Sequence, residues 1–115
     1  YHAEVDIWAK NGEIYLGHDG PEHRIDISFL KNDKMWCHCK NLEALERLLY
    51  DDIHCFFHKV DDVVLTSRGF IWTFPGKRLL KRSVCVLPEV AKYNKEELVR
   101  CVGICSDYVE RYRDL

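Results

Sequence analysis

The sequence lacks any long apolar run. Its apolar stretches are only a few residues long, whereas a helix needs roughly 18 to 20 mostly apolar residues to cross a bilayer. The sequence also lacks, at its N-terminus, the basic segment followed by an apolar one that marks a secretory signal. We therefore expect no transmembrane segment.

The sequence also lacks an excess of charge of one sign. It has 17 Lys and Arg against 19 Asp and Glu, which gives a net charge of -2. Nucleic-acid-binding proteins usually present a positive field to the phosphate backbone. This balance argues against nucleic acid as a partner.

No Ser/Gly-rich linker, internal repeat or low-complexity tract interrupts the 115 residues. We therefore expect one domain over residues 1–115, which is close to the commonest domain size. Its six cysteines alternate along a strand or lie in apolar stretches, where thiols behave as small hydrophobic groups. Free thiols indicate a reducing compartment, and the prediction is a cytoplasmic protein.

Short apolar runs rich in β-branched and aromatic residues predict strands. The predicted strands cover residues 3–9, 14–17, 35–39, 53–57, 69–73, 84–87 and 102–105. Several are apolar on both faces, which is typical of a parallel sheet covered by helices. The pair Asn11-Gly12 lies between the first two runs and predicts a β-hairpin.

Helices are expected between some of these strands. Residues 41–51 carry a leucine stripe behind Asn41, a residue that favours the N-cap, and residues 93–102 contain a second candidate cap, Asn94. A third short helix is expected over 108–115. The other connections are too short for long helices, so the predicted fold is α/β, a (β/α) TIM-type barrel with abbreviated helices.

Such barrels place the side chains that end their strands at one mouth. Glu4 and Asp6 are two residues apart, so both point to the same face of a strand. Paired carboxylates suit a hard divalent cation such as Mg²⁺ or Ca²⁺. The alternative for this pair is solvated charge on an edge strand.

His38 and Lys40 have the same spacing, with Cys37 and Cys39 on the opposite face. A histidine and a lysine that face a pocket suit an anion such as phosphate. The alternative is a hydrogen-bonded core histidine beside a lysine whose stem lies along the surface.

Two further groups of residues contain candidate ligands. A structural zinc site could use the cluster of Cys37, His38, Cys39, His54, Cys55 and His58. Their spacing differs from the usual zinc knuckles, and strand alternation would separate the ligands. The basic run "GKRLLKR" at residues 76–82 is either a solvated loop or a rim that attracts phosphate or an anionic lipid head group.

The segment "EVDIWAKNGEIYLGHD" resembles the strand, hairpin and His-Asp signature of the glycerophosphodiester phosphodiesterases and the wider phospholipase-C-like phosphodiesterase barrels. "HCK" at residues 38–40 is similar to the E-x-K of that family, and "GICSDY" at residues 103–108 to its closing G-I-x-T-D-Y. The resemblance covers nearly the whole chain. Within this family, the sequence is most similar to a branch of short, little-characterised proteins.

The resemblance implies that Glu4 and Asp6 ligate a divalent metal and that His18 is a catalytic histidine. Lys40 would contact phosphate, and His38 stands where the family has Glu. His58 and Trp72, which also end predicted strands, would line the substrate site with Lys40. Folding back at Asn11-Gly12 predicts that His18 lies nearer Glu4 than Asp6.

The family's first strand, with H-R-G and E-N motifs, has no counterpart before residue 3. We therefore expect an incomplete barrel that lacks its first β/α unit, with open edges that could pair in an oligomer. The predicted function is a metal-dependent phosphoric diester hydrolase that acts on a small-molecule or lipid-derived phosphodiester. The alternative is an inactive phosphoester-binding or scaffold barrel.

Overall fold

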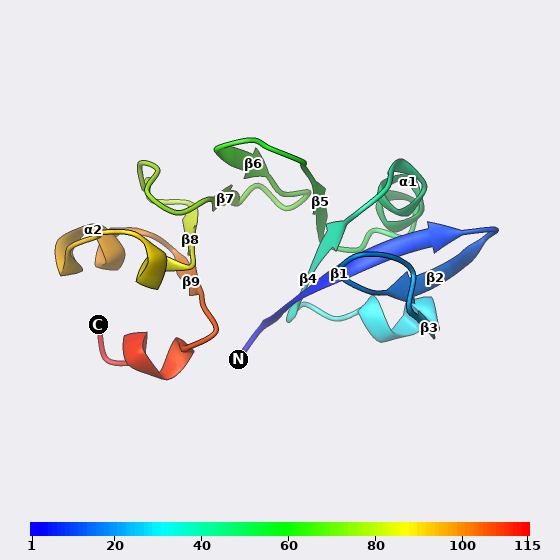
Figure 1. Ribbon diagram of the computed structural model, residues 1–115, viewed down its shortest axis with the longest axis horizontal. Coiled ribbons are helices and arrows are strands. Elements are labelled where there is room, and N and C mark those ends of the chain that lie inside the picture. The colour runs from blue at the N-terminus through cyan, green and yellow to red at the C-terminus, as the bar shows by residue number, and fades with distance from the viewer. The chain divides into compact units, whose positions relative to one another are not determined.

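A computed structural model describes all residues from 1 to 115 (Figure 1). The chain divides into two compact units. Unit 1 comprises residues 1–59 and 66–68, and unit 2 comprises residues 60–65 and 69–115. Each unit has a small mixed sheet of its own. No helix is long and apolar enough to span a membrane.

Unit 1 contains a five-stranded sheet with the order β3-β2-β1-β4-β5. Its strands are β1 (Ala3–Lys10), β2 (Glu13–Leu16), β3 (His23–Ile25), β4 (Met35–Cys39) and β5 (Cys55–Phe57). The pairs β1–β2 and β2–β3 are antiparallel, whereas β1–β4 and β4–β5 are parallel.

The β1–β2 hairpin confirms the prediction made from Asn11-Gly12. Both residues have positive φ, 52° for Asn11 and 79° for Gly12, as a two-residue hairpin turn of the primed type requires. Lys10 pairs with Glu13 across this turn, and Ile7 pairs with Leu16 at the far end of the ladder. The turn therefore sets the register that carries the chain back toward the start of β1.

One face of the unit 1 sheet packs against helix α1 (Leu42–Tyr50). Ala44 and Leu48 on the helix join Ile7, Cys37 and Cys55 in one buried cluster. The short 3₁₀ helix η1 (Ile27–Leu30) adds the buried side chain of Leu30 to this cluster. Because strand side chains alternate between faces, Glu4, Asp6 and His38 lie on the opposite face.

Unit 2 contains a four-stranded sheet with the order β6-β7-β8-β9. Its strands are β6 (Val63–Leu65), β7 (Ile71–Thr73), β8 (Ser83–Val86) and β9 (Gly103–Cys105). β6 is antiparallel to β7, and the pairs β7–β8 and β8–β9 are parallel. β8 is buried along its whole length, as both-face burial of a central parallel strand requires.

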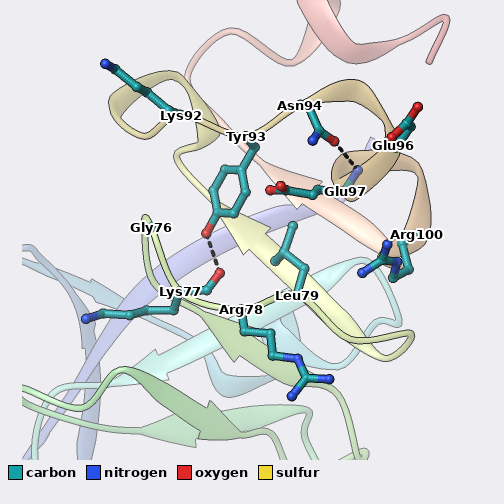
Figure 2. A pocket seen from close by; sticks show the side chains of 10 residues that line it. All are labelled: Gly76, Lys77, Arg78, Leu79, Lys92, Tyr93, Asn94, Glu96, Glu97 and Arg100. Carbon is teal, nitrogen blue, oxygen red and sulfur yellow. Dashed lines mark hydrogen bonds between the residues drawn. The ribbon is translucent and has the colours of Figure 1, made fainter.

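Helix α2 (Lys95–Arg100) packs on unit 2 through Leu98, which joins Leu79 and Cys85 in a buried cluster. The other helical segments are the 3₁₀ helices η2 (Pro88–Val90) and η3 (Val109–Tyr112), the latter where a third short helix was expected. The loop after β7 is held by Tyr93, whose hydroxyl donates to the carbonyl oxygen of Lys77 at 2.7 Å (Figure 2).

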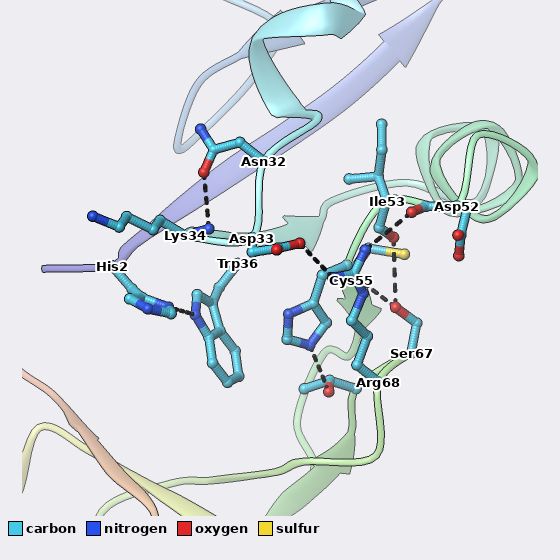
Figure 3. Close-up of polar contacts among 12 residues, drawn as sticks. His2, Asn32, Asp33, Lys34, Trp36, Asp52, Ile53, Cys55, Ser67 and Arg68 are labelled. Carbon is cyan, nitrogen blue, oxygen red and sulfur yellow. Dashed lines mark hydrogen bonds and ion pairs between the residues drawn. The ribbon is translucent and has the colours of Figure 1, made fainter.

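Residues 66–68 belong to unit 1 because their hydrogen bonds are made there (Figure 3). The amide of Ser67 donates to the carbonyl of Cys55 at 2.8 Å, and the Ser67 hydroxyl accepts from the Cys55 amide at 2.9 Å. Arg68 forms an ion pair of 3.0 Å with Asp33 and donates to the carbonyl of Asp52. These bonds attach the segment to the edge of the unit 1 sheet.

The prediction of a TIM-type barrel is wrong. The fold has two separate mixed sheets and two α-helices, and no barrel closes. The hairpin strand β2 pairs with the edge of β1 that a closed barrel would have to use, and β6 pairs with the corresponding edge of β7. Two antiparallel strands therefore end the parallel runs β1-β4-β5 and β7-β8-β9. The edges of this fold are therefore those of two open sheets, which end in β3 and β5 in unit 1 and in β6 and β9 in unit 2.

Candidate metal centre

The candidate site lies on the face of the unit 1 sheet opposite α1. The parallel register between β1 and β4 places Asp6 directly opposite His38 and Glu4 opposite Trp36. Glu4 and Asp6 share a face because they are two residues apart on one strand. The E-x-D motif and the histidine of "HCK" are thus brought together by the β1–β4 ladder.

Asp6 lies between two imidazoles. Its Oδ1 is 3.2 Å from Nδ1 of His38, and its Oδ2 is 3.0 Å from Nδ1 of His18. The two histidines differ in environment, since the side chain of His38 is 13% exposed and that of His18 is 80% exposed. Asp6 therefore orients one ring inside the protein and one in solvent.

Glu4, Asp6 and His38 form a group that could hold a metal ion. Each offers one ligand atom, and these three atoms lie within 4.8 Å of one another. Nε2 of His38 is buried and has no hydrogen-bond partner, although buried polar nitrogens are nearly always paired. A donor set of two carboxylates and one imidazole fits a divalent cation.

The two carboxyl groups have pKa values shifted in opposite directions. Burial, the Asp6 charge and a hydrogen bond with Asp6 raise the pKa of Glu4 to about 8. Glu4 is nevertheless an exposed residue, so contact with solvent limits this rise. Burial acts to raise the pKa of Asp6 as well, but hydrogen bonds with His38, His18 and Glu4 outweigh it and hold that pKa below its ordinary value.

The pKa shifts arise because two adjacent carboxyl groups cannot both ionise easily without a counter-charge. Asp6 carries the negative charge, and Glu4 keeps its proton up to a higher pH than an isolated glutamate. The charge of Lys40 lowers the pKa of both groups but only in part. A divalent cation would favour ionised Glu4 far more strongly than one lysine does.

Aromatic rings fix the orientation of His38. Its ring stacks on Phe56 with centroids 5.1 Å apart and an interplanar angle of 11°, and on His58 with centroids 4.4 Å apart and an angle of 10°. Phe56 lies opposite His38 in the β4–β5 ladder and is 2% exposed. Sequence reasoning missed Phe56, which could be found only once β4 and β5 were paired in register.

The structure brings together most of the residues predicted for the site. Glu4, Asp6, His18, His38 and His58 are connected by the contacts above. Lys40 follows β4 directly, where its amide donates to the carbonyl of Ile7 at 2.8 Å, and its charge acts on Glu4 and Asp6. Trp72 lies in β7 of unit 2, where it is 4% exposed, and is not among the residues assembled in unit 1.

Two expectations about this region need correction. His18 was expected nearer Glu4, but its ring contacts Asp6, because the hairpin ladder continues past Leu16 with a hydrogen bond from the Gly17 amide to the Asp6 carbonyl. The alternative zinc site is also not assembled. Cys37, Cys39 and Cys55 face the core shared with α1, and the residues grouped as possible metal ligands include no cysteine.

Comparison of the chain with protein-family models, with curated proteins and with solved structures finds no match.

Proposed function

We propose that the chain binds a divalent cation through Glu4, Asp6 and His38 and uses this site to hydrolyse a phosphodiester. The observation that carries the proposal is the meeting of three ligand atoms within 4.8 Å, one of them from His38, whose Nδ1 lies 3.2 Å from Oδ1 of Asp6 and whose buried Nε2 has no hydrogen-bond partner. The resemblance to the glycerophosphodiester phosphodiesterases supports the choice of substrate class. The proposal does not require a barrel, because every group it uses lies in unit 1.

A cation bound there would supply positive charge to a non-bridging phosphoryl oxygen. Lys40 would bind a second non-bridging oxygen as a point charge. Both interactions would strengthen as negative charge develops in the transition state, which is the requirement for catalysis rather than mere binding. Mg²⁺ and Ca²⁺ are the expected ions, and the imidazole ligand also makes Mn²⁺ a suitable test ion.

Water would attack the phosphorus atom, and His18 would transfer a proton to the leaving oxygen as its bond to phosphorus breaks. Its ring is exposed, so a substrate can reach it, and its Nδ1 is held by Asp6 at 3.0 Å. A carboxylate that holds one ring nitrogen fixes the orientation of the imidazole. His58, whose ring stacks on the cation ligand His38, would help to hold the phosphate in place.

The first test is cation binding to the full chain by calorimetry with Mg²⁺, Ca²⁺ and Mn²⁺. Asp6→Asn should weaken binding by about a hundredfold or more, because it removes the only group that contacts both histidines. Asp62→Asn is the matched control, since Asp62 is an exposed aspartate of unit 2 that pairs with Lys77. Equal affinity in the natural chain and Asp6→Asn would overturn the proposal.

The second test is hydrolysis of glycerophosphocholine and of an aryl phosphodiester in the presence of the bound cation. His18→Ala should abolish the cation-dependent rate, whereas His23→Ala, an exposed histidine on β3, should leave it unchanged. Binding of these diesters without turnover would favour the alternative, a phosphoester-binding or scaffold protein.

The proposal extends to a cytoplasmic location. All six cysteines are free thiols, and Cys37, Cys39, Cys55 and Cys85 are buried. Chains with many unpaired cysteines belong in reducing compartments. Oligomerisation through sheet edges remains a prediction, to be tested by light scattering.

A further inference from the structure

The basic run "GKRLLKR" contributes to a pocket in unit 2 that the proposed metal site does not use. The pocket has a volume of about 480 Å³, within the range of small-molecule sites. Residues 76–79 form one side and residues 92–94, with the face of α2 that carries Arg100, form the other (Figure 2). Two segments separated in sequence, residues 76–79 and residues 92–100, thus meet around one hollow.

The lining is predominantly basic. Four positive side chains, Lys77, Arg78, Lys92 and Arg100, line the pocket with two negative ones, Glu96 and Glu97. Lys77 forms an ion pair of 3.3 Å with Asp62. Arg78, Lys92 and Arg100 have no ion-pair partner within 4.0 Å, so their charged groups are available to a bound anion.

The pocket also has an apolar floor and a fixed wall. Leu79 is 4% exposed and belongs to the unit 2 core. Tyr93 packs against the same core, and its hydroxyl donates to the Lys77 carbonyl at 2.7 Å. This bond ties residues 92–94 to the loop that carries Arg78, so the two sides of the pocket are held together without a ligand.

Glu97 does not cancel the positive charge. Asn94 accepts a hydrogen bond from the Glu97 amide at 2.8 Å, which begins α2, and the Glu97 carboxylate has no ion pair within 4.0 Å. Figure 2 shows this carboxylate on the side of Tyr93, whereas the guanidinium groups of Arg78 and Arg100 lie on the other side of Leu79. The arginine side therefore carries the positive surplus.

We propose that this pocket binds a phosphorylated small molecule, with Arg78 and Arg100 on its phosphate group and Leu79 and Tyr93 against its organic part. Guanidinium groups bind phosphate oxygens with two parallel hydrogen bonds, which makes arginine the residue best suited to this task. Lys92 adds charge at the rim. The same phosphate chemistry could be presented by a soluble ester or by a lipid head group.

The experiment uses the full chain in the presence of a chelator, so that no cation occupies the unit 1 site. Calorimetry is performed with inorganic phosphate, pyrophosphate and phenyl phosphate, and sedimentation with phosphatidylcholine vesicles that contain phosphatidic acid. We expect saturable binding, with phenyl phosphate tighter than inorganic phosphate because its ring contacts Leu79 and Tyr93. Binding of the soluble probes identifies a soluble ester, and binding of vesicles alone identifies a lipid phosphate.

Substitutions locate the site. Arg78→Gln and Arg100→Gln should each weaken binding about tenfold, the effect of one lost charge-assisted pair. Lys92→Gln should weaken it about two- to threefold. Lys95→Gln is the matched control and should leave binding unchanged. Lys95 is an exposed lysine three positions after Lys92, and it does not line the pocket.

All four substitutions are at exposed positions, so the fold should survive each of them. Failure of all the probes to bind would overturn the proposal. So would an equal loss in Lys95→Gln and Arg100→Gln, which would mean that the anion responds to general surface charge. Neither result bears on cation binding at Glu4 and Asp6, which is measured without phosphate.

Discussion

Units 1 and 2 have the same arrangement of strands but carry clusters of oppositely charged side chains. Each has three parallel strands in chain order, bordered on one side by antiparallel pairing. All six histidines and the Glu4–Asp6 pair are in unit 1, whereas the charged side chains that line the pocket of unit 2 are four Lys and Arg against two Glu. The two regions therefore suit ligands of opposite sign.

The difference extends to how the charged groups are held. In unit 1, Asp6 and His38 lie on paired strands, so the ladder fixes the distance between them. In unit 2, Arg78 and Arg100 come from a loop and a helix end and are exposed. A strand-borne cluster suits a small cation that needs closely spaced ligands. Loop-borne bases suit a larger anion that tolerates movement of the side chains.

The largest expected effect comes from the two cores. Leu48 of α1 is completely buried and Leu98 of α2 is 9% exposed. Leu48→Ala should lower the free energy of unfolding of unit 1 by about 3 kcal/mol, and Leu98→Ala that of unit 2 by about 2 kcal/mol. Urea denaturation followed by tryptophan fluorescence can separate the two when one background keeps only Trp8 and Trp36, which are in unit 1, and another keeps only Trp72, which is in unit 2. Equal losses would show that the two helices are equally well packed.

Acid should affect unit 1 through His54. This histidine is 4% exposed and its Nε2 lies 2.8 Å from Oγ1 of Thr66, beside Trp36. Burial, with the charges of Arg68 and His2, lowers the pKa of His54 to about 4. Figure 3 shows the hydrogen bond between His2 and Trp36 and the ion pair of Arg68 in the same region.

The lowered pKa of His54 determines whether stability rises or falls with pH. Between the unfolded value of 6.5 and about 4, the unfolded chain binds the proton and the folded chain does not. Stability is therefore present above this window and is lost as the pH falls through it, by up to about 3 kcal/mol. The measurement is the free energy of unfolding against pH for the natural chain and for His54→Phe, which cannot titrate. Identical slopes in the two proteins would contradict the assignment.

Ligands of opposite charge should stabilise the two units separately. At a concentration about a hundred times its dissociation constant, a ligand that binds only the folded state adds about 2.7 kcal/mol. Mg²⁺ or Ca²⁺ should stabilise the unfolding transition of unit 1, which Trp8 and Trp36 report. Phenyl phosphate in the presence of a chelator should stabilise the unfolding transition of unit 2, which Trp72 reports. Stabilisation of unit 2 by the cation would contradict the assignment of the cation to unit 1 and of the anion to unit 2.

Local patterns in the sequence predicted the local structure well. Alternating apolar residues located most strands, Asn11-Gly12 located the hairpin, and Asn41 and Asn94 were found as N-caps of α1 and α2. Each of these features depends on neighbours within a few residues, so the local sequence is enough to determine it. The short strands β3 and β6 were missed because three-residue strands rich in exposed side chains carry no clear alternation.

Long-range pairing could not be predicted in the same way. The barrel prediction assumed that parallel strands continue to a closed ring, but the edges of β1 and β7 are occupied by antiparallel neighbours. For the candidate site, the spacing of Glu4 and Asp6 was enough to place both on one face. The contact of Asp6 with His38 depends on the β1–β4 register, and the pocket depends on the approach of Lys92 and Arg100 to the basic loop.

The smallest effects should come from the two helix caps, and they sharpen the comparison of the units. Asn41 accepts hydrogen bonds from the amides of Ala44 and Ala9 and donates to the carbonyl of Ala9, so it joins α1 to β1. Asn94 accepts only from the amide of Glu97. Asn41→Ala should therefore cost about 2 kcal/mol and Asn94→Ala about 1 kcal/mol, as measured by urea denaturation.

Substitution by aspartate separates capping from the contact with the sheet. Aspartate keeps the oxygen that caps each helix but cannot donate to the Ala9 carbonyl. Asn94→Asp should leave unit 2 as stable as before, whereas Asn41→Asp should lose about 1 kcal/mol in unit 1, because a backbone carbonyl loses its donor and faces a negative charge. If Asn41→Asp were as stable as the natural chain, the bond to β1 would contribute nothing, and the two caps would be equivalent despite their different surroundings.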